Sequence, residues 1–265
     1  MSPGKLIFCV FGAVGVIGLA VSMSGAANEP KVGRKDDAEL AQPFVERFDV
    51  LDRDRWFVAS GWKSGDYAIN DWRTSQVSVK RGLFLEMSKN KTDLAEYSSG
   101  EVQSRAVYGH GYFESSLRAA RGSGLVTGFF TYTGPHYKKP WHEIDVEILG
   151  KDTRKVQLTY FTDGKKVKKT VPLGFDASRD FHVYAFDWQP GWITWYVDGV
   201  PVHRVDGSNL KLPSEPQKIM VSLWGSDVLR SWLGPFERRV LPANAAVACI
   251  AYARDLNGAG ECRPR

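Results

Sequence analysis

Over residues 44–265, apolar and polar residues alternate in short runs that are separated by turn-forming residues. Gly82–Ser88 (GLFLEMS) and Lys155–Thr162 (KVQLTYFT) are two such runs, and a period of two is typical of β-strands. Trp192–Val205 (WITWYVDGVPVHRV) predicts a hairpin, because its Asp-Gly pair suits the type I′ turn between antiparallel strands. The sequence has neither long helical periodicity nor an internal repeat. It therefore predicts one all-β domain over this range, folded as a sandwich of two antiparallel sheets.

The N-terminal segment has the pattern of an export signal. A lysine precedes the apolar run Leu6–Met23, and the small residues of SGAAN follow it. This order predicts a signal peptide over residues 1–27, cleaved near Ala26 or Ala27. An uncleaved membrane anchor is the alternative, since about 18 apolar residues just span a bilayer. We expect a secreted or periplasmic protein that has no stable membrane association once the signal is removed.

Residues 28–43 are polar and charged and lack periodicity, which predicts a flexible linker before the β domain. The whole chain has 265 residues, of which 43% are hydrophobic, so a real core can form. The net charge of +5 permits an acidic partner, such as nucleic acid, anionic lipid or acidic polysaccharide, and selects none of them.

The cysteines predict one disulfide. Cys9 leaves with the signal peptide, and Cys249 and Cys262 remain near the C-terminus. An even pair in an exported chain suggests a bond that pins the tail, with two free buried thiols as the alternative.

Three acidic residues stand at alternate positions in Pro140–Gly150 (PWHEIDVEILG). On a strand, Glu143, Asp145 and Glu147 share one face, and the apolar residues between them face the core. Acidic residues on an exposed strand face often serve only to keep the protein soluble. Here, however, no lysine alternates with the acids to relieve their repulsion, and aromatic residues flank them. Crowded carboxylates have pKa values that are pushed apart, which makes this row a candidate site.

Paired carboxyl groups with different pKa values are what glycosidic cleavage requires. One is ionised and acts as the nucleophile, and the other holds a proton for the leaving oxygen. Four residues of strand separate the two glutamate Cα atoms by about 13 Å. A retaining mechanism needs carboxyl groups about 5–5.5 Å apart, so the strand must curve toward the substrate or the side chains must lean together.

The motif EIDVEILG resembles the active-site signature of glycoside hydrolase family 16, Glu-x-Asp-x-Glu. The stretches GFFTYTGP, LGFDAS, YAFDWQPGWITWYVDG, PQKIMVSLWG and WLGPF are similar, in the same order, to the bacterial licheninases and related exopolysaccharide glycanases of that family. The resemblance runs from about Phe44 to Phe236. It implies a concanavalin A-like β-jelly-roll sandwich with a sugar-binding cleft, and endo-hydrolysis of β-1,3-1,4-glucan or a related exopolysaccharide with retention of configuration.

The resemblance also implies roles for single residues. Glu143 corresponds to the nucleophile, Glu147 to the general acid/base, and Asp145 to the acid between them. The residues that match positions in the cleft are Glu114, Phe130, Trp141, Trp224 and Trp232. Each aromatic residue has core packing as its alternative, because Trp and Phe are usually buried.

Several positions depart from the licheninase pattern, although the three acids are intact. Thr159 and Phe161 replace an amide and a phenol, and Ser222 replaces an Asn. Lysines crowd the sequence near Trp141 and again in what we expect to be a turn at residues 165–169, where they either attract an acidic exopolysaccharide or form a solvated loop. We expect the chemistry to be retained, and the changed positions leave open whether the substrate is cereal mixed-linkage glucan or a different polymer.

Other chemistries fit the sequence poorly. It contains neither a His-Glu-x-x-His motif nor a Cys-x-x-Cys pair, so we expect no metal and no cofactor. Three acids in the site would repel phosphates, so we expect no nucleic acid. The prediction is a monomeric hydrolase acting on a polysaccharide. A transglycosylase on the same fold and a non-catalytic, lectin-like sandwich remain alternatives.

Overall fold

The computed structural model describes residues 41–208 and 210–262. The predicted signal peptide, residues 1–27, lies outside the described residues, as does the predicted linker up to residue 40. At the end of that linker, the Ala41 N–H donates to the carbonyl of Val107. Within the described ranges, no helix is long and apolar enough to cross a membrane.

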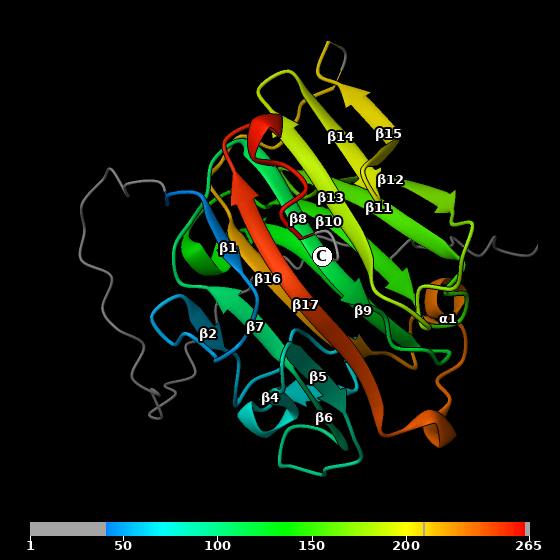
Figure 1. The fold of residues 1–265 in the computed structure, drawn as a ribbon. Coiled ribbons are helices and arrows are strands. Elements are labelled where there is room, and N and C mark those ends of the chain that lie inside the picture. The colour runs from blue at the N-terminus through cyan, green and yellow to red at the C-terminus, as the bar shows by residue number, and fades with distance from the viewer. Residues whose placement is uncertain (1–40, 209, 263–265) are drawn as a thin grey trace, which may run out of the picture. The chain divides into compact units, whose positions relative to one another are not determined.

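Two large antiparallel sheets make up most of the fold (Figure 1). The strands of the eight-stranded sheet are β1 (Phe44–Glu46), β4 (Val77–Val79), β5 (Leu83–Met87), β8 (Gly111–Arg118), β13 (His182–Gln189), β14 (Trp192–Val197), β15 (Val200–Asp206) and β17 (Ala243–Ala253). Their order is β15-β14-β13-β8-β17-β5-β4, and β1 pairs with β17.

The strands of the seven-stranded sheet are β2 (Trp56–Val58), β7 (Glu101–Ser104), β9 (Leu125–Thr133), β10 (His142–Leu149), β11 (Lys155–Thr162), β12 (Lys165–Pro172) and β16 (Lys218–Gly225). Their order is β12-β11-β10-β9-β16-β7-β2. A short parallel pair lies apart, consisting of β3 (Asn70–Trp72) and β6 (Tyr97–Ser99). The described helices are α1 (Arg230–Leu233) and the 3₁₀ turns Thr74–Gln76, Pro135–Tyr137, Arg238–Val240 and Leu256–Gly258. The predicted all-β fold with two antiparallel sheets is confirmed.

The core lies between the two sheets and draws on both. Ile144, Val146 and Ile148 of β10 are buried in it, as the alternation in the sequence predicts. Phe129 of β9 contacts Phe186 of β13 with ring centroids 5.8 Å apart, which joins one sheet to the other. Truncating a buried aromatic residue of this kind typically costs about 3–5 kcal/mol. Core packing therefore fixes the position of β10, whose opposite face carries the three acidic residues.

A buried hydrogen bond also ties β10 to the opposite sheet. The indole N–H of Trp195 in β14 donates to the main-chain carbonyl of Asp145 at 3.2 Å. A carbonyl that already lies within a sheet accepts this second bond because it has two lone pairs. The bond fixes the middle of β10, where the acidic row lies.

Tight turns join the two strands of each of two hairpins. Asp198 and Gly199 both have positive φ angles, 50° and 80°, as the predicted type I′ turn between β14 and β15 requires. Asp163 and Gly164 form a similar turn, with φ angles of 50° and 75°. Because this turn needs only two residues, the lysines that we expected in a turn lie instead in β12, the edge strand.

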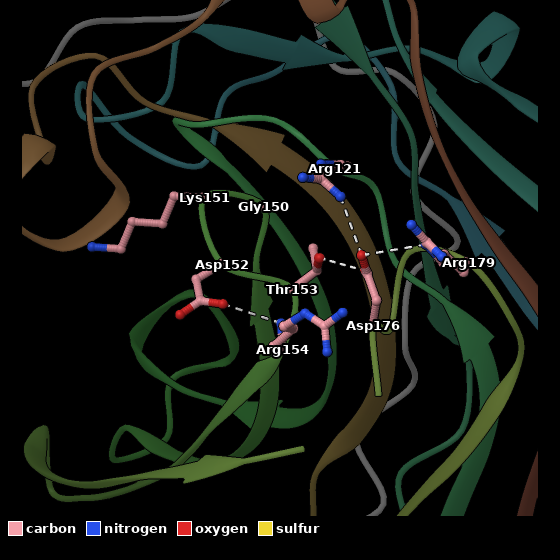
Figure 2. Close-up of a pocket in the computed structure, with 8 residues that line it drawn as sticks. All are labelled: Arg121, Gly150, Lys151, Asp152, Thr153, Arg154, Asp176 and Arg179. Carbon is pink, nitrogen blue, oxygen red and sulfur yellow. Dashed lines mark hydrogen bonds and ion pairs between the residues drawn. The ribbon is translucent and has the colours of Figure 1, made fainter. Parts of the chain in front are cut away.

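The loop after β10 is clamped by a buried carboxylate (Figure 2). Asp176 accepts hydrogen bonds from Thr153 at 2.6 Å and from Ser178, and forms an ion pair with Arg121 at 3.1 Å. The hydroxyl groups of Ser178 and Thr153 hold the pKa of Asp176 well below its usual range, with a smaller effect from Arg121. Three connecting loops therefore meet at one ionised group, at the end of β10 that carries Glu147.

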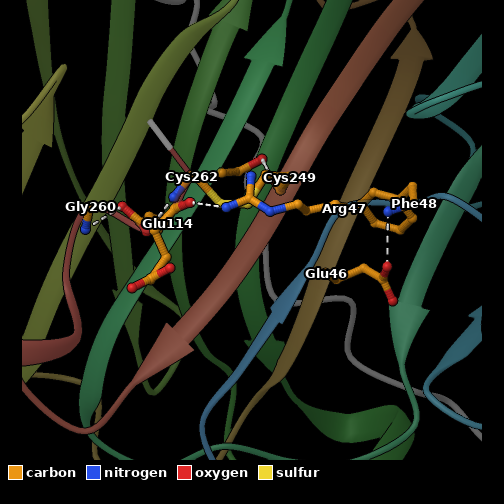
Figure 3. Close-up of a disulfide and its surroundings, with 9 residues drawn as sticks. Glu46, Arg47, Phe48, Glu114, Cys249, Gly260 and Cys262 are labelled. Atoms are coloured by element: carbon orange, nitrogen blue, oxygen red, sulfur yellow. Dashed lines mark hydrogen bonds between the residues drawn. A yellow bond between two sulfur atoms is a disulfide. The ribbon is translucent and has the colours of Figure 1, made fainter. Parts of the chain in front are cut away.

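A disulfide closes the last described part of the chain over the eight-stranded sheet (Figure 3). Cys249 in β17 bonds to Cys262, and both residues are buried. The Glu114 carboxylate of β8 accepts the backbone N–H of Gly260 at 3.1 Å and of Cys262 at 2.9 Å. The guanidinium group of Arg47 donates to the carbonyl of Glu261. The predicted disulfide is present, and the tail is held by hydrogen bonds as well.

Candidate active site

Strand β10 places its three acidic side chains on one face of the seven-stranded sheet, here called the acid face. Glu143 and Glu147 are half-buried, and Asp145 between them is only 4% exposed. Antiparallel partners point to the same side, so residues of β9 and β11 opposite the acids also belong to the acid face. These neighbours are Tyr132, Phe130 and Gly128 on β9, and Phe161, Thr159 and Gln157 on β11.

Two hydrogen-bond donors converge on Glu143. The indole N–H of Trp141 donates to its Oε2 at 2.5 Å, and Asp145 makes a side-chain hydrogen bond to it. The Trp141 ring stacks on Phe161, with centroids 4.6 Å apart and planes at 13°. Hydrogen bonds from such donors stabilise the charged form of a carboxyl group. These two hydrogen bonds therefore favour the ionised form of Glu143 and act against the effect of its burial.

Glu147 has a different set of partners. The side-chain amide of Gln157 donates to its Oε2 at 2.6 Å, and the Thr159 hydroxyl lies 3.4 Å from the same oxygen. Gln157 is held in turn by the indole N–H of Trp232, which donates to its Oε1 at 2.9 Å. This fixes which end of the amide faces Glu147. On the other side, Gly128 of β9 pairs with Glu147 and carries no side chain.

The three acids influence one another's protonation. Burial raises the pKa of Glu143 to about 7, although the hydrogen bonds from Trp141 and Asp145 act against the shift. Burial, the charges of both glutamates and the hydrogen bond to Glu143 raise the pKa of Asp145 well above its usual range. Burial also raises the pKa of Glu147, opposed by Lys166 and Gln157. The hydrogen bond between Asp145 and Glu143 raises the pKa of Asp145 and lowers that of Glu143, so it acts in opposite directions on the two carboxyl groups.

All four predicted aromatic residues lie near the acids. Trp141 contacts Glu143, Phe130 is paired with Asp145, and Trp232 reaches Glu147 through Gln157. The Trp224 ring lies 5.9 Å from that of Trp232. None of the four rings is fully buried, so the core-packing alternative is wrong for each of them. Partly exposed aromatic faces beside paired carboxyl groups are suited to stacking on sugar rings.

The sequence profile of "Glycosyl hydrolases family 16" matches residues 64–239. The chain belongs to this family. It is 41% identical over 194 residues to the β-glucanase of Paenibacillus macerans, a match that covers 73% of this chain and 81% of that protein. It is 37% identical over 240 residues to the β-glucanase of Bacillus licheniformis, covering 90% of this chain and 95% of the relative.

Solved structures of family 16 enzymes have the same fold. A β-1,3-1,4-glucanase (lichenase) from a mouse hindgut metagenome superposes with a TM-score of 0.77 at 36% identity, covering 81% of this chain and 100% of that one. The B. licheniformis β-glucanase gives a TM-score of 0.76 at 38% identity, covering 80% and 98%. The expected β-jelly-roll sandwich is confirmed, and this chain is a glycoside hydrolase of family 16.

The position of Glu114 corrects the prediction that it lies in the cleft. Its strand, β8, belongs to the eight-stranded sheet, and its carboxylate binds the backbone of the C-terminal tail. The neighbouring Phe113 points into the core, so Glu114 points to the outside of the sandwich. The apolar Phe113 before it indicated which face of the strand points to the core, but nothing local indicated which sheet the strand joins.

A different buried glutamate lies on the acid face, and the sequence analysis did not single it out. Glu101 of β7 is 5% exposed and accepts a hydrogen bond from Gln103 at 2.7 Å. Burial raises the pKa of Glu101 to about 7, and the charge of Glu143 adds to this. The period-two signal was available in GEVQS, where Glu101 and Gln103 flank Val102.

No metal site is found among the described residues. In residues 41–208 and 210–262, no group of three or more His, Cys, Asp or Glu side chains has an arrangement that could hold a metal ion. The acid face itself offers three carboxyl groups of β10, with hydrogen-bond donors and aromatic rings around them.

Proposed function

We propose that this protein is a secreted endo-β-glycanase that hydrolyses β-1,3-1,4-glucan or a related bacterial exopolysaccharide with retention of configuration. The observation that carries the proposal is the division of partners along one strand. Glu143 receives the Trp141 and Asp145 hydrogen bonds, and Glu147 is held separately by Gln157. The β-glucanase and lichenase relatives support the choice of substrate class.

In this proposal Glu143 is the nucleophile. Its carboxylate attacks the anomeric carbon and forms a covalent glycosyl-enzyme, while the bond to the leaving oxygen breaks. Asp145 supports the step because its proton stabilises the carboxylate before attack. The assignment follows the position of Glu143 in the family motif, and the Trp141 and Asp145 hydrogen bonds lower the pKa of Glu143 against the effect of burial.

Glu147 is the general acid and then the general base. It gives its proton to the leaving glycosidic oxygen, and later takes a proton from the water that releases the sugar from Glu143. Gln157 and Trp232 hold Glu147 in position for both steps. A transglycosylase would use the same first half-reaction and pass the sugar to another hydroxyl group, so it stays the close alternative.

A polysaccharide would lie across the acid face and stack on its aromatic rings. The lysines of β12 give one specific reason to consider an acidic polymer: Lys166 and Lys168 pair with Phe161 and Thr159, so they also lie on the acid face. Trp141, Trp224 and Trp232 supply rings for sugar stacking in either case. A lectin-like sandwich would bind such a chain without needing both glutamates.

The test is product analysis with barley mixed-linkage glucan, laminarin and a succinoglycan-type acidic exopolysaccharide. Chain length and new reducing ends are followed for the mature protein and for Glu143→Gln. We expect the wild-type protein to cleave mixed-linkage glucan or the acidic polymer. NMR of the first products should show that the anomeric configuration is retained. Binding of all three without cleavage would contradict the enzyme proposal, and transfer to added oligosaccharide without new reducing ends would favour the transglycosylase.

A further inference from the structure

The edge strand of the seven-stranded sheet brings positive charge to the acid face. Side chains of β12 alternate between the two sides of the sheet, so Lys166 and Lys168 share the side of the acids, while Lys165 and Lys169 point the other way. Lys166 pairs with Phe161, which pairs in turn with Glu143 across β11. Lys166 therefore lies in the same cross-strand row as Glu143.

Two aromatic rings bracket the Lys166 ammonium group. Its Nζ lies 4.8 Å from the centroid of Trp232 and 5.3 Å from that of Phe161, both within cation–π range. Each ring also contacts a partner of one glutamate. Phe161 stacks on Trp141, which donates to Glu143, and Trp232 donates to Gln157, which donates to Glu147. The ammonium group thus lies between two rings, one in contact with the hydrogen-bond partner of Glu143 and the other with that of Glu147.

Other charged and titratable groups also face the acids, from each neighbouring element. They are Lys168 of β12, Tyr132 of β9, Glu101 of β7, Tyr67 from the segment between β2 and β3, and Lys218 of β16, whose Nζ lies 5.1 Å from the Tyr137 ring centroid. Tyr67, Tyr132 and Glu101 are neutral when protonated and negative when ionised, so in neither state do they stabilise ionised carboxyl groups by charge. The positive charge of Lys166 lowers the pKa of all three acids of β10, and that of Lys168 lowers the pKa of Glu147.

We propose that Lys166 is a positioning residue that sets the pH range of catalysis, by holding a fixed positive charge between Phe161 and Trp232 beside the acids of β10. This inference rests on the proposed roles of Glu143 and Glu147. It assigns to a residue of the edge strand an effect on both steps of the reaction, without contact with the reacting atoms.

The direction of the effect follows from charge alone. A nearby cation favours the ionised form of a carboxyl group, so removing it raises the pKa of that group. Glu143 must be ionised to attack, so the acidic limb of the pH profile moves to higher pH. Glu147 must be protonated to act as the acid, so the alkaline limb also moves to higher pH. The whole bell-shaped profile therefore shifts in one direction.

The experiment measures kcat/KM on barley mixed-linkage glucan against pH for wild type, Lys166→Met, Lys166→Arg and Lys169→Met. Lys169→Met is the matched control, because it removes the same charge from the same strand on the opposite face. We expect Lys166→Met to move both limbs up by on the order of one pH unit. Lys166→Arg keeps the charge and should superimpose on wild type, as should Lys169→Met.

Two outcomes would overturn the proposal. A Lys166→Met profile that superimposes on wild type would show that the lysine does not act on the acids. Equal shifts in Lys166→Met and Lys169→Met would assign the effect to the overall surface charge. Should Lys166→Met fold poorly by circular dichroism, Lys166→Gln provides the same loss of charge with a polar side chain.

A readout without turnover separates this proposal from the proposed function. NMR titration of ¹³C-labelled glutamate carboxyl groups, in wild type and in Lys166→Met, should show the upward shift directly. If Glu143→Gln kept full activity, the proposed function would be wrong, but an upward shift of the carboxyl pKa values in Lys166→Met would still support this inference. An active wild type with unshifted carboxyl titrations in Lys166→Met would overturn the inference alone.

Discussion

Glu114 is buried and Glu143 is half-buried, both on central strands, and the two carboxyl groups have different surroundings. The Glu114 carboxylate accepts two backbone N–H groups of the tail on the outside of the eight-stranded sheet. Glu143 accepts hydrogen bonds from the side chains of Trp141 and Asp145 among other acids. Burial raises the pKa of both. A raised pKa alone therefore does not separate a structural from a functional carboxyl group, whereas the nature of the hydrogen-bond partners does.

The largest expected effect comes from removing the carboxylate of Glu143. Glu143→Gln keeps the size of the side chain and removes the nucleophile, so kcat on barley glucan should fall on the order of 10⁴-fold or more. Because burial raises the pKa of this acid, its neutral amide should leave the melting temperature unchanged or higher. Turnover close to wild type in a folded Glu143→Gln protein would reject the assignment.

The next effect concerns Glu147. Glu147→Gln should lower kcat on glucan by about 10²–10⁴-fold, the usual contribution of general acid–base catalysis. An aryl glycoside with a good leaving group needs no acid, so its first step should proceed, and azide should restore turnover with a glycosyl azide of retained configuration as product. Failure of azide to restore turnover on that substrate would count against the acid/base role.

A substitution of Glu114, the buried glutamate of the eight-stranded sheet, should affect stability and not catalysis. Glu114→Gln places an amide N–H₂ group near the N–H groups of Gly260 and Cys262, and should cost about 1–3 kcal/mol of unfolding free energy. For a domain of this size each kcal/mol lowers the melting temperature by roughly 2–4 °C. Calorimetry and kcat/KM measured below the transition test this together. A fall in kcat/KM without a fall in melting temperature would make Glu114 functional after all.

The last expected effect is a pH dependence of stability. The pKa of Glu143 rises from 4.5 in the unfolded chain to about 7 in the fold, so the folded state binds more protons between these values. The contribution of this group to stability is fully present below about 4.5 and is lost as the pH rises through about 7. The melting temperature of wild type relative to Glu143→Gln should therefore decline from pH 4.5 to 7.5. A constant difference across this range would contradict the raised pKa.

Local pattern was sufficient to predict part of this molecule. The strand β11, the type I′ hairpin after β14 and the shared face of Glu143, Asp145 and Glu147 all follow from periodicity and turn chemistry within a few residues. The strand pattern also predicted a sandwich of two antiparallel sheets, and the family resemblance then predicted its jelly-roll form and the aromatic residues near the acids.

Contacts between distant segments were not predictable in the same way. Period-two alternation gives the face of a strand but not its sheet, so it could not correct the family correspondence that placed Glu114 in the cleft. Trp232 reaches Gln157 across 75 residues of sequence, and no local signal encodes that contact. The lysines of β12 were assigned to a turn because a dense run of charge is also typical of loops.

The place of β17 in its sheet has a consequence for how the chain is made. This strand, Ala243–Ala253, pairs with β1, β5 and β8, whose residues are synthesised long before it. Until a growing chain reaches Ala253, β8 and β5 have no shared neighbour, and the eight-stranded sheet stays open in its middle. Pairing between such distant segments is entropically costly and slow to form. The domain therefore completes its fold only after nearly all of it has been synthesised, and a chain interrupted before β17 would expose two unpaired strand edges to other molecules.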